Sequence, residues 1–104
     1  MFDIKTLKSD AALVASAPRS TLASPVLLEA VTHLLDVPGP NRSACMARRL
    51  RQTEFEEFQS LCRALLGSPA KNDCDLLRLQ LYADIVHEAL DDQSRSYSAS
   101  LAAE

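Results

Sequence analysis

Glycine and tryptophan are nearly missing from this chain of 104 residues, which has two glycines and no tryptophan. So few glycines exclude a glycine-rich loop that would cradle a phosphate group. Long apolar runs are missing too, since the longest spans only a few residues, and no segment is predicted to cross a bilayer. The N-terminal residues lack the basic region and the apolar stretch of a signal peptide. We therefore expect a cytoplasmic protein.

The cysteines are three in number and widely spaced. Cys45, Cys62 and Cys74 form no CxxC pair, which argues against a disulfide framework and against a zinc site. We expect three reduced, mostly buried thiols, as is usual in a reducing cytoplasm. His33 and His87 have no partner at the i, i+4 spacing of a helical metal site, and no serine lies in a nucleophile elbow. The sequence therefore predicts no metal, no cofactor and no enzymatic activity.

The residues that are abundant favour helices. Alanine and leucine are frequent, hydrophobic residues make up 47% and charged residues 24% of the chain, and the net charge is −3. This balance is ordinary for a globular protein and gives no overall attraction to nucleic acid or to anionic membranes. A chain of this length forms one domain with one modest core. We predict a single all-α domain over residues 1–104, a small bundle of four to five helices.

The two ends of the chain carry weaker patterns than its middle. Residues 1–19 hold apolar positions at helical spacing, so they either form a first helix that Pro18 closes or remain a mobile N-terminal arm. Residues 93–104 are rich in serine and are predicted to form a loose C-terminal tail. The core of the bundle is therefore expected from the segments between these two ends.

Caps and breaks mark the helices in between. Ser24 is the predicted N-cap of a helix that starts at Pro25 and ends near Asp36, before a break at Val37–Asn41. A core stripe recurs every three or four positions along residues 55–66. Further predicted boundaries are the N-cap Asn41, a capping box at Thr53 and Glu56, a left-handed C-cap at Gly67 and a last N-cap at Asn72 or Asp73.

The last predicted helix carries more apolar surface than a small bundle buries. At about 100° per residue, the polar side chains of residues 76–91 occupy only about one third of the circle. Either the helix is central and buries all of its apolar surface, or part of that surface contacts a second copy or another protein. The apolar side chains divide into one stripe of Leu79, Tyr82, Ala83, Val86 and Leu90 and a second stripe of Leu81, Ile85 and Ala89.

We predict that this helix contributes a protein interface. Leu81 and Ile85 are favoured, because their stripe lies nearer to the polar edge. The helix from Pro25 to Leu35 is similarly wide, so the two helices are expected to share one surface. The predicted interface residues of the two helices are Leu79, Leu81, Tyr82, Ile85, Val86, Ala89, Leu27 and Val31.

A basic segment follows the predicted break. It holds Arg42, Arg48, Arg49 and Arg51 without an intervening acidic residue. One interpretation is a solvated face with ion pairs, and another is recognition of an acidic protein surface, in which Arg48 and Arg49 join the interface. A third is a helix-turn-helix that binds DNA through Arg42–Arg51. Its second helix would open with three glutamates, which phosphates repel.

The chain resembles a known family in its size and in the layout of its helices. The resemblance depends on three segments, which are SPVLLEAVTHLLDV, TEFEEFQSLCRALLG and DLLRLQLYADIVHEAL. A small acidic helical chain built from them resembles the small anti-activator proteins of bacterial quorum sensing. The resemblance implies a dimeric helical protein without enzymatic activity. Such a protein would bind the ligand-binding domain of a LuxR-type transcription factor and block its dimerisation and DNA binding. The resemblance carries over no individual contact residues.

The function expected from the sequence is therefore regulation by protein contact. We expect a homodimeric, cytoplasmic interaction protein that inhibits a transcription factor. The alternatives are a small DNA-binding regulator that uses Arg42–Arg51 and a secretion chaperone or adaptor.

Overall fold

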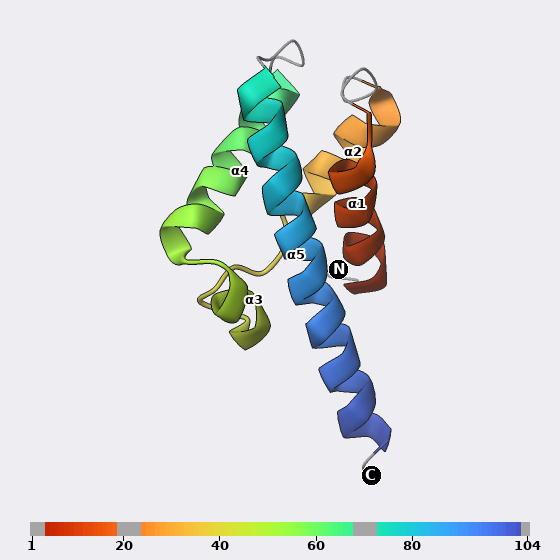
Figure 1. The fold of residues 1–104 in the computed structure, drawn as a ribbon. Coiled ribbons are helices and arrows are strands. Elements are labelled where there is room, and N and C mark those ends of the chain that lie inside the picture. The colour runs from red at the N-terminus through yellow and green to blue at the C-terminus, as the bar shows by residue number, and fades with distance from the viewer. Residues whose placement is uncertain (1–3, 19–23, 68–72, 103–104) are drawn as a thin grey trace.

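The computed structural model describes residues 4–18, 24–67 and 73–102, which form five α-helices and no β-strand (Figure 1). The predicted all-α fold with four to five helices is confirmed for this part of the chain. No described helix combines the length and the apolar character that crossing a membrane requires. The helices are α1 (Ile4–Ser16), α2 (Pro25–Leu34), α3 (Ala44–Arg49), α4 (Gln52–Gly67) and α5 (Asp73–Ala102).

The long helix α5 is the centre of the bundle. It packs against α1, α3 and α4, while α2 packs against α1 and α4 (Figure 1). At about 1.5 Å per residue, its 30 residues account for most of the 49 Å long dimension of the molecule. The C-terminal turns of α5 extend past the other four helices (Figure 1). A central helix needs apolar side chains on several sides, which explains much of the width of the apolar band on α5.

One hydrophobic core holds the described helices together. Every described helix contributes side chains to it, and the largest fully buried ones include Phe58 of α4, Leu34 of α2 and Leu90 of α5. The Phe58 ring lies between two other aromatic rings, with centroids 6.1 Å from Phe55 and 6.4 Å from Tyr82. A single contiguous core is typical of one domain.

The N-terminal segment is part of the body of the protein, so its description as a mobile arm is wrong for residues 4–16. Leu7, Ala11 and Val14 of α1 are buried in the core. The C-terminal end of α1 is also fixed, because the Gln80 side-chain amide of α5 donates to the carbonyl oxygens of Val14 at 3.1 Å and Ala17 at 2.6 Å. These two bonds satisfy carbonyls that a helix end would otherwise leave without partners.

The C-terminal segment also differs from the prediction. Instead of a loose tail from residue 93, the chain continues as helix to Ala102, and only residues 103–104 lie outside the described part. Arg95 Nη2 lies 2.7 Å from Asp91 Oδ2, one turn earlier, and 3.3 Å from Asp92 Oδ1. Such pairs at i, i+4 and i, i+3 support a helix.

The helix boundaries follow the predicted chemistry with small shifts. Ser24 caps α2 as predicted, since its hydroxyl accepts from the Leu27 amide, and Pro25 is the first helical residue. Ser43, not Asn41, caps α3. The predicted capping box is displaced by two residues, because Glu54 accepts from the Arg51 amide at 2.9 Å.

The predicted left-handed cap at Gly67 is wrong, since this last residue of α4 has no positive φ. Of the two predicted caps of α5, Asn72 lies outside the described residues, and α5 begins at Asp73.

An ion pair joins α1 to α5. Lys8 Nζ lies 3.2 Å from Asp91 Oδ1, and both side chains are about one third exposed. The hydrogen bond from Lys8 is the main reason why the pKa of Asp91 lies below its ordinary value of 3.8. Ionised Asp91 therefore favours the folded state.

We expect the protein to become less stable in acid, because this ion pair is lost when Asp91 is protonated. Because the pKa of folded Asp91 is depressed, its stabilisation is present above the ordinary value near 3.8 and is lost as the pH falls through the folded value. Urea denaturation between pH 6 and about pH 2 measures the loss. The Lys8→Met variant should have a shallower decline over this window, and an unchanged decline would contradict the role of the pair.

Candidate interaction surface

The first predicted stripe of α5 forms the centre of the core. Leu79, Val86 and Leu90 are at most 1% exposed, and Ala83 is fully buried. The neighbouring helices therefore already cover Leu79 and Val86, which were predicted as interface residues. The same holds for Ala89 of the second stripe, which is 1% exposed.

The predicted interface residues of α2 are also core residues. Leu27 and Val31 are 4% and 0% exposed and belong to the same core cluster as the buried stripe of α5. The two helices thus share apolar contacts as predicted, but these contacts are internal. A wide apolar band on both helices follows from their position between other helices and leaves nothing at these residues for a partner to touch.

The exposed apolar surface of α5 is smaller and lies on its outer side. Leu81 is 66% exposed and Leu77, one turn earlier, is 48% exposed. Ile85, one turn later, is half-buried and packs against the core. Of the predicted residues, the structure thus leaves Leu81 open and Ile85 partly open, and it adds Leu77. We call Leu77 and Leu81, with the partly open edge of Ile85, the outer face of α5.

Leu77 is not among the predicted interface residues, because the helical wheel places it between the polar residues Asp84 and Glu88. Residues four apart lie on one side of a helix, so the spacing between Leu77 and Leu81 was the available signal. Exposed Asp84 and Glu88 continue the same side of α5 toward its C-terminus. The outer face is therefore an apolar pair of leucines with an acidic flank.

A small polar cluster borders the outer face where α5 meets α4. Arg78 of α5 pairs with Glu57 of α4, and the Tyr82 hydroxyl donates to the other oxygen of Glu57 at 2.5 Å. This hydrogen bond is the main cause of a raised pKa for Tyr82. Tyr82, one of the predicted interface residues, is thus half-buried, and its hydroxyl is hydrogen-bonded to Glu57.

The two predicted interface arginines differ in their contacts. Arg49 of α3 contacts two carboxylates of α5, Asp92 at 2.6 Å and Glu88 at 2.8 Å. The hydrogen bond to Asp92 is the largest cause of a raised pKa for Arg49. Arg48 is exposed, and its side chain contacts only its own helix, at the carbonyl of Ala44 and the sulfur of Cys45. Arg49 therefore links α3 to α5, and these two carboxylates neutralise its charge.

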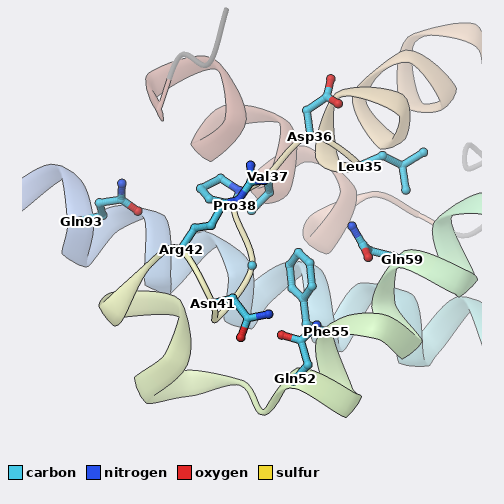
Figure 2. A pocket seen from close by; sticks show the side chains of 11 residues that line it. Leu35, Asp36, Val37, Pro38, Asn41, Arg42, Gln52, Phe55, Gln59 and Gln93 are labelled. Carbon is cyan, nitrogen blue, oxygen red and sulfur yellow. The ribbon is translucent and has the colours of Figure 1, made fainter.

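A second feature is a cleft beside the loop between α2 and α3. The sequence predicts only a helix break at this loop. Its volume is about 610 Å³, and it lies between residues 35–42 and one side of α4, with Gln93 of α5 at its edge (Figure 2). The buried ring of Phe55 points toward this loop (Figure 2). A β-carbon at Gly39 would come within 3.0 Å of that ring, so glycine allows the close approach.

The described residues hold no group of three or more His, Cys, Asp or Glu side chains that could bind a metal ion. No known protein family matches the chain, and comparisons with characterised proteins and with solved structures found no similar protein. The resemblance to quorum-sensing anti-activators stays a prediction from the sequence.

Proposed function

We propose that the protein is a non-enzymatic interaction protein that binds its partner through the outer face of α5. The observation that carries the proposal is the pair Leu77 and Leu81, which lie one turn apart on the solvent side of the central helix α5. Exposed leucines are not unusual singly, but two adjacent on one helix face are a typical element of helix recognition.

The energy available from this face is appropriate for a specific contact. Complete burial of a leucine side chain contributes about 1.5–3 kcal/mol, and association entropy opposes it. Two leucines and the edge of Ile85 supply an apolar centre. Asp84 and Glu88, the second of which pairs with Arg49, supply a polar rim. This matches the usual division of an interface into an apolar core and a polar border.

The partner that we propose is a transcription regulator of the LuxR type, bound at its ligand-binding domain. Inhibition would follow if the outer face covers the surface through which that regulator dimerises. The proposal of a homodimer uses the same outer face, so the two kinds of contact compete or alternate. The support for this partner class is the sequence resemblance, and the support for its location is the exposure of Leu77 and Leu81.

The test is binding of a purified LuxR-type ligand-binding domain to wild type and to Leu81→Asp, measured by calorimetry. A charge at the centre of the apolar pair should lower the affinity at least about tenfold, as loss of a central anchor does. Val26→Asp is the matched control, because Val26 of α2 is also 66% exposed but belongs to another helix. Equal affinities for both variants, or no binding by wild type, would contradict the proposal.

Self-association is tested separately by size-exclusion chromatography with light scattering. Wild type should be dimeric at high concentration, whereas Leu81→Asp should be monomeric and Val26→Asp should resemble wild type. A monomeric wild type would remove the homodimer and leave the partner contact standing. A dimer that persists in Leu81→Asp would place the dimer contact elsewhere on the protein.

A further inference from the structure

The cleft beside the loop between α2 and α3 gathers most of the carboxamide side chains of the protein. The whole sequence contains only six asparagine and glutamine residues. Four of them line this cleft, namely Asn41, Gln52, Gln59 and Gln93. Gln80 is committed elsewhere, to the end of α1. Such a concentration in one place favours a ligand that both donates and accepts hydrogen bonds.

The carboxamides of the cleft have hydrogen-bonding capacity to spare. Gln93 accepts from the Ser43 hydroxyl at 3.2 Å through its oxygen, which fixes the side chain and leaves the amide nitrogen available. Gln52 makes one long contact of 3.5 Å to Glu56. Within the described structure, the side chains of Gln59 and Asn41 make no hydrogen bond. A ligand with matching donors and acceptors can therefore pair with these amides.

Two of the carboxamides lie at a fixed spacing along α4, on either side of Phe55. Gln52, Phe55 and Gln59 lie along one side of α4, so the two amides flank the aromatic ring (Figure 2). At about 1.5 Å per residue, seven positions separate Gln52 from Gln59 by roughly 10 Å along the helix. Three residues of extended peptide span about the same length, at about 3.3 Å per residue. A carboxamide presents N–H and C=O side by side, which complements a backbone amide.

Arg42 adds a charge preference. Its side chain lines the cleft, is exposed, and forms no ion pair with any described residue. The acidic side chain of the lining, Asp36, points away from the Phe55 ring (Figure 2). A free guanidinium beside amide donors is well suited to a carboxylate.

We propose that this cleft binds an extended acidic peptide segment, whose backbone amides pair with Gln52 and Gln59 and whose carboxylate pairs with Arg42. The volume of about 610 Å³ fits such a segment and lies within the usual range of binding sites. The cleft is lined by the loop, by α4 and by Gln93, and the outer face of α5 is not part of it. The two sites can therefore fail or succeed independently.

The experiment uses three N-acetylated, C-amidated hexapeptides of alanine and proline that differ at one central position, which is glutamate, glutamine or lysine. Each is titrated into ¹⁵N-labelled full-length protein, and the side-chain amide signals are followed by NMR. The glutamate peptide should shift the signals of Asn41, Gln52 and Gln59. Gln80 serves as the internal control, because its amide is already engaged with α1 and should not shift.

Two variants test whether Arg42 binds the carboxylate of the peptide. Arg42→Gln should weaken binding of the glutamate peptide at least about tenfold, as loss of one charge-assisted hydrogen bond does. It should also remove the preference for glutamate over glutamine. Arg63→Gln is the matched control, since Arg63 of α4 is also exposed without an ion pair but does not line the cleft.

Three results would overturn the proposal. These are no shift of the cleft amides with any of the peptides, equal affinity for the lysine peptide, and equal or tighter binding of a hexathymidylate, which would identify a nucleic-acid site instead.

Discussion

Replacement of Phe58 by alanine is expected to remove about 3–5 kcal/mol from the free energy of unfolding. Phe58 is fully buried, and its ring packs between Phe55 of the same helix and Tyr82 of α5. Truncation to alanine removes the transfer energy of the ring and leaves a cavity where α4 meets the central helix. The two flanking rings also lose their aromatic contact, which contributes about 0.5–1.5 kcal/mol per pair beyond burial.

The expected loss is large compared with the total stability. A chain of this length has about 5–15 kcal/mol in all, so the Phe58→Ala variant should unfold at a much lower urea concentration. Circular dichroism in urea measures the midpoint and the slope. Val26→Ala is the control, because this valine is 66% exposed and its truncation should change the stability by no more than about 0.5 kcal/mol. Similar losses for both variants would contradict the assignment of core and surface.

The sequence could predict where most helices begin, because capping is local chemistry. Ser24 and Pro25 identify the start of α2, since both act on backbone groups within one turn. The start of α4 was harder, because Thr53 with Glu56 and Arg51 with Glu54 are both compatible with a capping arrangement. Only the structure shows that the Arg51 amide finds Glu54. The choice depends on where the preceding loop places the chain.

The end of α5 could have been predicted better than it was. No glycine or proline follows Asp73, and Asp91 with Arg95 is a favourable pair at i, i+4 spacing. The serine content of the last residues favours a loose tail, whereas the lack of helix breakers favours a continued helix. Serine lowers helix propensity only modestly, so a long helix that is already formed can continue through it.

The exposed apolar surface of α5 could be predicted only in part. A helical wheel gives the width of an apolar band but does not say how many neighbours surround the helix. Because α1, α3 and α4 all pack on α5, most of its band is internal, and Leu79 and Val86 became core residues. What remains is the smaller pair Leu77 and Leu81. The apolar surface that α5 offers to a partner is therefore limited to these two leucines and the edge of Ile85.

The three thiols provide the second large expected effect. Cys62 is fully buried in the core, and burial raises its pKa to about 12, against an ordinary value of 9.0. Cys74 is exposed at the N-terminal end of α5, and Cys45 is buried. Only the thiolate is nucleophilic, so a group with such a pKa has about one reactive molecule in ten thousand at pH 8.

In the native protein at pH 8, we therefore expect Cys74 to react with a thiol reagent at least about a thousand times faster than Cys62. Mass spectrometry of the labelled peptides follows each cysteine, and the Cys74→Ser variant should lose the fast phase. Labelling in urea should make all three thiols equivalent. The raised pKa also means that folding stability falls as the pH rises from about 9 toward 12, because the unfolded thiol ionises first. Rapid labelling of Cys62 in the native state would show that the contact between α4 and the rest of the core opens readily, and it would also weaken the expectation for Phe58, one turn earlier on the same helix.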